Sequence, residues 1–141
     1  DICSIIDKTL DNKEILKAPV TLGLFKYNGS WDWPAWEMTY KEANTTPDRI
    51  PSVVSIEKYE TGSARVAFKV TQKDDRSTFT NIIALTDGGE AVEVYSEIEW
   101  QSLRTMCKNI FSFTAEKSSI NTLSVISSST SFGLMSYFFN T

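Results

Sequence analysis

The feature that most constrains the fold is a period of two. Between Ile50 and Trp100, apolar side chains alternate with polar ones in short runs, and a turn signal follows each run. Successive side chains of a strand point to opposite faces, so this period predicts half-buried strands at the spacing typical of sandwiches and barrels. The runs are residues 54–60, 64–71, 78–86 and 92–100. We predict that they form a four-stranded antiparallel meander.

The run over residues 64–71 separates its two faces. Ala64, Val66, Phe68 and Val70 share one side, and the side between them carries mostly polar residues. We expect the first face to be buried and the second to be solvated. Residues 87–89, Asp-Gly-Gly, predict a tight hairpin because glycine accepts the positive φ angles of primed turns.

The chain before this region gives three shorter elements. We predict a short strand at residues 2–6, a turn at 7–14 and an extended run at 20–27. Pro19 bounds the extended run and restricts the preceding residue to extended geometry. The N-terminal part therefore also favours strands over helices.

Three segments remain. Residues 28–51 hold three of the four prolines without a sustained period, which predicts a long aromatic loop. Residues 103–113 favour a strand over a helix, and the tail, residues 117–141, yields no firm assignment. We expect residues 1–141 to form a single antiparallel β-sandwich domain, or a fragment of one.

Composition restricts the partners and the compartment. A chain of 141 residues that is 41% hydrophobic can bury a core, and its net charge of -4 argues against nucleic acid as a partner. No run approaches the roughly 18 apolar residues of a membrane span, so we expect a soluble chain without a membrane partner.

Cys3 and Cys107 can form a disulfide or remain two thiols, and we favour thiols. No localisation follows.

The side chains needed for most catalysis are missing. The chain has no histidine, which excludes histidine-assisted nucleophiles and the commonest metal ligand. Two cysteines cannot provide the four ligands of a structural zinc site, and no glycine-rich phosphate loop is present. Carboxylates remain, because a glycosidase works with two of them. Glu93, Glu97 and Glu99 lie on the polar side of one predicted strand, where we expect a solvated face.

The aromatic segment offers the better candidate site. Trp31, Trp33 and Trp36 lie within six positions, together with Asp32 and Glu37. Aromatic rings stack on the apolar faces of sugars and carboxylates bind hydroxyls, so these five residues form our candidate carbohydrate-binding site. The alternative, which we favour, is that the rings pin a long loop to the sheet.

Two glycosylation patterns lie at the ends of this segment. Asn28 and Asn44 each begin an Asn-x-Ser/Thr acceptor pattern. Chance matches are ordinary in a Ser/Thr-rich chain, so the two patterns are weak evidence for a secretory protein.

The order of these segments resembles the region that follows the catalytic part of glycoside hydrolase family 38 α-mannosidases. The resemblance covers about residues 2–115. It rests on an apolar strand at 20–25, Trp-Pro-Ala-Trp-Glu-Met at 33–38, a valine-rich strand ending in Glu-Thr-Gly at 60–62, strands at 64–72 and 82–85, an acidic strand ending at Trp100, and a Lys-x-x-Phe-x-Phe-like run at 108–113. The tail departs from the family pattern in its serine-rich residues 121–131.

The resemblance implies a fold for this chain and places the catalytic residues in another domain. It implies a β-sandwich of the galactose-mutarotase-like, supersandwich type, of which this chain holds a part. The family's zinc ion, its Asp and His ligands and its catalytic aspartate are implied to lie in an N-terminal α/β domain. No catalytic residue and no cofactor is therefore assigned to this chain.

Three functional hypotheses follow. The first is a non-catalytic segment that supports hydrolysis of α-mannosides by a catalytic α/β domain, its partner, outside this chain. The second is a carbohydrate-binding module that binds mannose-containing glycans through Trp31, Trp33 and Trp36. The third, an interaction domain unrelated to sugars, requires a strand order different from the predicted meander.

Overall fold

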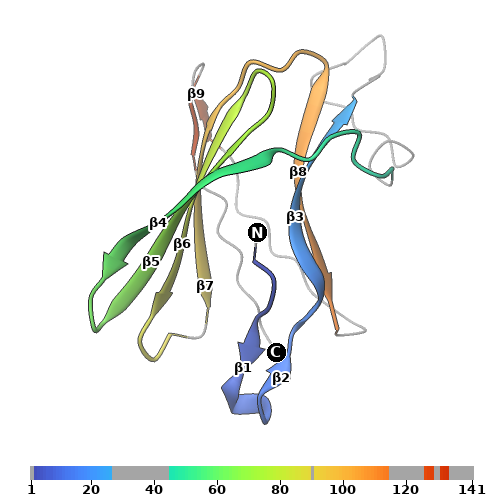
Figure 1. Ribbon diagram of the computed structural model, residues 1–141. Coiled ribbons are helices and arrows are strands. Elements are labelled where there is room, and N and C mark those ends of the chain that lie inside the picture. The colour runs from blue at the N-terminus through green and yellow to red at the C-terminus, as the bar shows by residue number, and fades with distance from the viewer. Residues whose placement is uncertain (1, 27–44, 90, 115–125, 129–130, 134–141) are drawn as a thin grey trace. The chain divides into compact units, whose positions relative to one another are not determined.

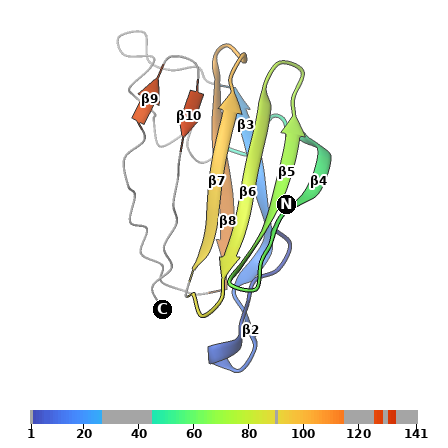
Figure 2. The ribbon, with the colours of Figure 1, turned by 90° about the vertical axis from the view of Figure 1, so that its left-hand side faces the viewer.

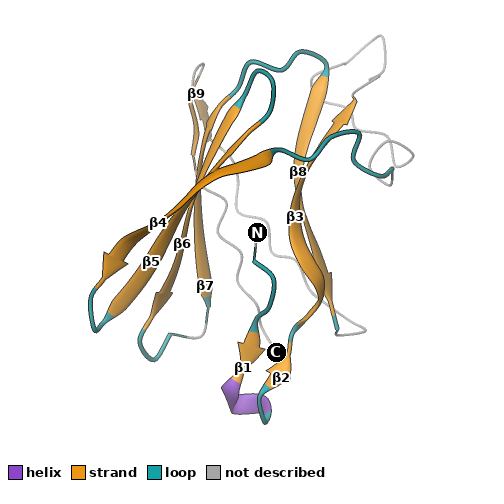
Figure 3. Ribbon diagram, in the orientation of Figure 1, coloured by secondary structure: helices purple, strands orange, loops and turns teal. Residues whose placement is uncertain are grey.

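The computed structural model describes residues 2–26, 45–89, 91–114, 126–128 and 131–133. The chain forms two compact units, Asp1–Pro51 with Leu103–Ser118, and Ser52–Ser102 with Ser119–Thr141. The described residues form β-strands and one short 3-10 helix, η1 (Lys8–Leu10) (Figure 3). All the strand pairs are antiparallel, so the predicted all-β, antiparallel fold class is confirmed. No helix in these ranges is long and apolar enough to cross a membrane.

The first unit contains two pairs of strands. β1 (Ile6–Asp7) and β2 (Lys13–Glu14) form a hairpin around η1. Residues 2–5 form no strand, so the strand predicted at 2–6 is wrong except at Ile6, and the region predicted as a turn, 7–14, holds most of the hairpin. β3 (Leu16–Lys26) pairs with β8 (Thr105–Phe113), as Figure 1 shows. The strand favoured for residues 103–113 is therefore confirmed.

Strand β3 carries the core of the first unit. Its register with β8 shifts between Leu16 and Ala18 and again between Ala18 and Thr21, the interval that contains Pro19. Proline cannot donate a ladder hydrogen bond. Beyond the shift, Leu22, Leu24 and Phe25 are buried. The partner strand holds Cys107, whose pKa burial raises to about 12. Both cysteines are thiols, as expected.

The second unit is built on one six-stranded sheet (Figures 1 and 2). Its first four strands neighbour one another in chain order, which confirms the predicted meander and removes the premise of the interaction-domain hypothesis. β6 has the predicted bounds. The sheet runs in the order β4 (Ser52–Thr61), β5 (Arg65–Lys73), β6 (Thr78–Thr86), β7 (Val92–Glu99), β10 (Ser131–Gly133) and β9 (Ile126–Ser128).

The hairpin between β6 and β7 has the predicted chemistry. Gly88 adopts a φ of 67°, in the left-handed region that favours glycine. The Gly89 N–H donates to the Thr86 carbonyl at 3.0 Å and closes the turn. Local turn residues therefore set the point where the chain reverses.

The apolar face of β5 is buried over only part of its length. Val66, Phe68 and Val70 share a face as predicted, since the register with β6 is continuous. Val70 is buried, but Val66 and Phe68 are exposed, so the prediction of a buried face is wrong at this end. On the other face, which was predicted to be solvated, Ala67 is buried. Alternation predicts which face a residue lies on but not what covers that face.

Candidate functional site

The predicted carbohydrate-binding residues lie outside the described part of the chain. This holds for the five residues of the aromatic cluster and for both glycosylation acceptors: Trp31, Asp32, Trp33, Trp36, Glu37, Asn28 and Asn44. The structure does describe the residues that flank this segment, a hollow beside those flanks, and two polar clusters elsewhere.

The two flanks of the aromatic segment lie side by side. The Lys26 N–H donates to Oδ2 of Asp48 at 2.6 Å. Leu24 forms an antiparallel bridge with Arg49, in which the Leu24 N–H donates to the Arg49 carbonyl at 2.9 Å. The N–H of Asp48 donates a hydrogen bond to the Leu24 carbonyl at 2.9 Å. The chain thus departs from the end of β3 and comes back to the same edge.

A glycine permits this close approach. A Cβ atom at Gly23 would lie 2.9 Å from Cγ of Pro47 and 2.9 Å from Cε2 of Phe25. Neither ring can move aside easily, since proline is rigid and Phe25 is fully buried. Only a residue without a side chain lets the returning segment pack against β3.

A shallow hollow of about 220 Å³ lies beside the flanks. It is lined by Leu24, Phe25, Lys26, Asp48, Arg49 and Thr105. The hollow is smaller than the roughly 300 Å³ at which ligand pockets begin. Among the described residues, the lining holds one carboxylate, Asp48, which already accepts the Lys26 N–H, whereas glycoside hydrolysis uses two. The described lining by itself therefore does not supply a glycosidase site.

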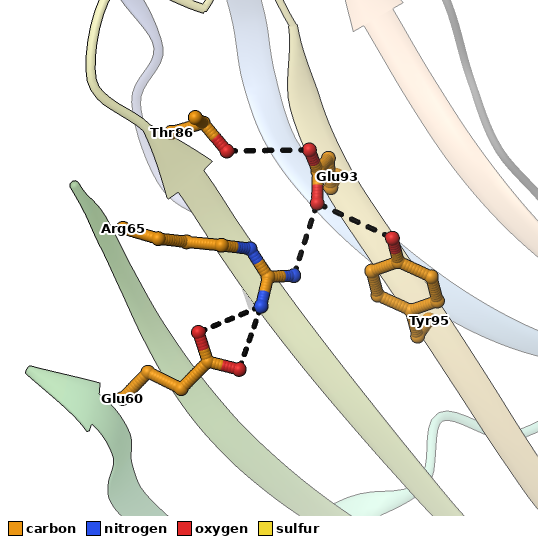
Figure 4. Close-up of polar contacts among 5 residues, drawn as sticks. All are labelled: Glu60, Arg65, Thr86, Glu93 and Tyr95. Atoms are coloured by element: carbon orange, nitrogen blue, oxygen red, sulfur yellow. Dashed lines mark hydrogen bonds and ion pairs between the residues drawn. The ribbon is translucent and has the colours of Figure 1, made fainter. Parts of the chain in front are cut away.

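A polar cluster of five described residues lies on the second unit, across four strands. Arg65 on β5 donates through Nη1 to both carboxylate oxygens of Glu60 on β4, at 2.6 and 2.7 Å, and through Nη2 to Glu93 on β7 at 3.0 Å. Tyr95 donates its hydroxyl to Glu93 at 3.3 Å, and the Arg65 guanidinium lies 5.9 Å from the Tyr95 ring centroid. Thr86 on β6 donates to the other Glu93 oxygen at 3.4 Å (Figure 4). We call these five residues the Arg65 cluster.

A β-bulge places Glu60 in the Arg65 cluster. Glu57 lies opposite Lys69 and Glu60 lies opposite Ala67, so three residues of β4 span two of β5. Tyr59 is the extra residue. Without it, Glu60 would pair one position further along and project from the other face of the sheet. No period-two pattern in the sequence predicts this placement.

The Arg65 cluster is unsuited to general acid catalysis. A carboxylic acid that protonates a leaving group needs a raised pKa. The hydrogen bond from Arg65 instead lowers the pKa of Glu93, with smaller contributions from the hydroxyls of Tyr95 and Thr86. Both carboxylates bind the same guanidinium. The arrangement ties strands together and leaves no proton to donate.

The other two glutamates of β7 behave as expected. Glu97 and Glu99 are exposed on the same face as Glu93. Glu93 departs from the simple solvated-face prediction because its partner, Arg65, comes from a strand two positions away in the sheet. A pattern within β7 carries no information about that partner.

A small buried hydroxyl network lies at the opposite end of the same sheet. The hydroxyls of Ser77 and Ser102 lie 2.8 Å apart, and both residues are buried. The Gln101 N–H donates to the Ser77 hydroxyl at 3.0 Å, and Ser102 donates to Oδ2 of Asp74 at 3.2 Å. The chain lacks histidine, the commonest base for a serine nucleophile, and the two buried hydroxyls bond to each other. The described contacts of the network are structural.

The described residues offer no ligand set for a zinc ion. They contain no group of three or more Cys, Asp or Glu side chains that could hold a metal, and the whole sequence lacks histidine. Family 38 zinc chemistry, which the sequence resemblance implies, therefore has no fit among these residues.

Comparison with known families identifies the chain. The profile described as "Glycosyl hydrolases family 38 C-terminal domain" matches residues 1–135. The match continues past residue 115, where the recognisable strand pattern ended, and includes most of the tail. Comparisons with curated proteins and with solved structures found no match. The chain belongs to the glycosyl hydrolase family 38 C-terminal domain, an all-β domain with antiparallel sheets.

Proposed function

We propose that this chain is a non-catalytic domain that supports the hydrolysis of α-mannosides by a catalytic domain outside it. The main support for this proposal is the family match over residues 1–135, combined with the complete absence of histidine from the sequence. Glu60 and Glu93 both form ion pairs with the guanidinium of Arg65, which is a structural contact. The partner is then the catalytic α/β domain of the parent enzyme, and the zinc ion belongs to that domain.

The experiment compares the chain with and without its partner. The purified chain is expected to release no mannose from aryl α-mannosides, with or without added zinc. Added to the separately produced catalytic domain, it is expected to raise that domain's thermal stability and its turnover. Turnover by the chain alone, surviving removal of contaminating glycosidases, would refute the proposal. So would a catalytic domain that is unaffected by saturating amounts of the chain.

A second candidate function uses the aromatic segment. We propose as the alternative that Trp31, Trp33 and Trp36, with Asp32 and Glu37, bind mannose-containing glycans. The favouring observation is that the flanks of this segment are bonded together at one edge of β3, through contacts such as Lys26 to Asp48. Anchored flanks lower the cost of ordering a binding loop.

Tryptophan fluorescence tests this alternative. Mannosides are expected to quench or shift the emission of the chain, and Trp36→Ala is expected to abolish the change without altering the circular dichroism. Trp100 provides an internal reference, because its ring packs edge-on against Phe79 at 6.2 Å. A titration in which Trp36→Ala responds like the unaltered chain would exclude the tryptophan site.

A further inference from the structure

The two faces of the second unit's sheet differ in chemistry. One face carries the Arg65 cluster (Figure 4). On the other face the register places Val66 opposite Leu85 and Phe68 opposite Ile83. Ile56 on β4 lies opposite Val70, diagonal to Phe68. The second face is therefore apolar across three neighbouring strands.

One end of this apolar face is uncovered. Val66, Phe68, Leu85 and Ile56 are 44%, 45%, 50% and 61% exposed, whereas Val70 further along the same face is 5% exposed. We call the four exposed residues the apolar patch. Isolated exposed hydrophobic residues are ordinary, but contiguous ones from three strands mark a surface that another molecule covers.

The chemistry of the apolar patch restricts its occupant. A sugar needs hydrogen-bonding groups, and the only charged side chain placed beside the patch by the register is Lys58, opposite Phe68. An anionic membrane surface or a nucleic acid needs basic residues, whereas the chain carries a net charge of -4. An apolar protein surface fits the patch best.

The size of the apolar patch indicates which kind of protein covers it. A stable complex between free proteins buries roughly 1,200–2,000 Å², more than four partly exposed side chains supply. Domains of one polypeptide need less, since a linker raises the effective concentration to about the millimolar range. A tethered domain therefore fits better than a second copy of the chain.

We propose that the apolar patch is the docking surface for the catalytic domain of the same enzyme. This inference rests on the proposed function and adds the surface through which the support acts. Burying Val66, Phe68 and Leu85 against that domain would remove their apolar area from water. It would also leave the Arg65 cluster, on the opposite face, available to solvent.

Affinity measurements with matched variants test the proposal. The chain and the catalytic domain are produced separately, and their binding is measured by NMR titration at concentrations up to the roughly millimolar value that a linker would supply. Phe68→Asp is expected to weaken binding at least tenfold. Leu103→Asp makes the same chemical change at a residue that is 80% exposed and outside the patch, and is expected to bind like the unaltered chain. Circular dichroism confirms that both variants are folded.

Cysteine labelling provides a second readout that does not introduce a charge. In a Cys3→Ser background, Phe68→Cys is expected to react rapidly with a maleimide in the chain alone, and slowly once the catalytic domain is added. Cys107 contributes little signal because its pKa is raised to about 12. Protection of position 68 in the isolated chain would show that the chain covers the patch itself, and would overturn the proposal.

The remaining outcomes distinguish failure of the docking surface from failure of the supporting function. Binding that is unaffected by Phe68→Asp, with position 68 still reactive in the complex, would overturn the docking surface and leave the supporting function intact. Failure of the unaltered chain to bind or stabilise the catalytic domain even at about millimolar concentration would overturn both.

Discussion

The buried hydroxyl network allows a prediction whose size follows from counting bonds. Ser77 takes part in two hydrogen bonds, with the Gln101 N–H at 3.0 Å and with the Ser102 hydroxyl at 2.8 Å. Ser102 also takes part in two, the shared one and the bond to Asp74 at 3.2 Å. A hydrogen bond of this kind contributes about 1 kcal/mol net to the free energy of unfolding. Each single substitution to alanine therefore removes two such contributions.

The shared bond makes the two substitutions non-additive. Ser77→Ala and Ser102→Ala are each expected to lower the free energy of unfolding by about 2 kcal/mol, which is about 6 °C in Tm for a chain of this size. The double variant loses three bonds in total, so its expected loss is about 3 kcal/mol. The expected coupling between the two sites is thus about 1 kcal/mol, the contribution of the bond counted twice.

Urea denaturation measures all three variants. The exposed Ser63, changed to alanine, serves as the control and is expected to alter the free energy of unfolding by less than about 0.5 kcal/mol. An m-value equal to that of the unaltered chain shows that the extent of unfolding is the same. The reasoning would be refuted by strictly additive losses, or by single variants no less stable than Ser63→Ala.

Two further substitutions test other parts of the structure. Gly23→Ala is expected to lower the free energy of unfolding by about 1–3 kcal/mol, because the added methyl group meets two rings at 2.9 Å. Gly62→Ala, whose nearest contact is 3.4 Å, is the matched control in the same urea denaturation experiment. Glu93→Gln tests the lowered pKa of Glu93: the ionised form stabilises the fold above the ordinary pKa of 4.5, and this contribution disappears as the pH falls through the lower folded-state value. The stability difference between the unaltered chain and Glu93→Gln should therefore be largest at pH 7 and should shrink as the pH falls in the acid range; a difference that does not shrink in acid would contradict the ion-pair explanation.

Local patterns accounted for most of the second unit's sheet. The alternation in residues 78–86 predicted β6 with its observed bounds, and the glycine at position 88 marked the following turn. Strand formation and chain reversal depend on neighbouring residues, so a sequence pattern can predict both. The predicted aromatic site stays a prediction, since its residues lie outside the described ranges.

Contacts between distant residues could not be predicted in this way. The pairing of β3 with β8 joins segments separated by most of the chain, and the Ser77–Ser102 bond joins residues that no shared pattern connects. The bulge at Tyr59 is a further case, because it reverses the face on which Glu60 projects without disturbing the alternation that precedes it.

The sequence by itself determined what this chain lacks and which strands it forms. Missing histidine excludes the commonest catalytic and zinc chemistry whatever the fold, and period-two alternation sorts residues onto faces. The tertiary structure decided which of those faces is covered. Val66 and Val70 lie on the same face of one strand, yet only Val70 is buried. Burial depends on what packs above a residue, and strand alternation carries no information about it.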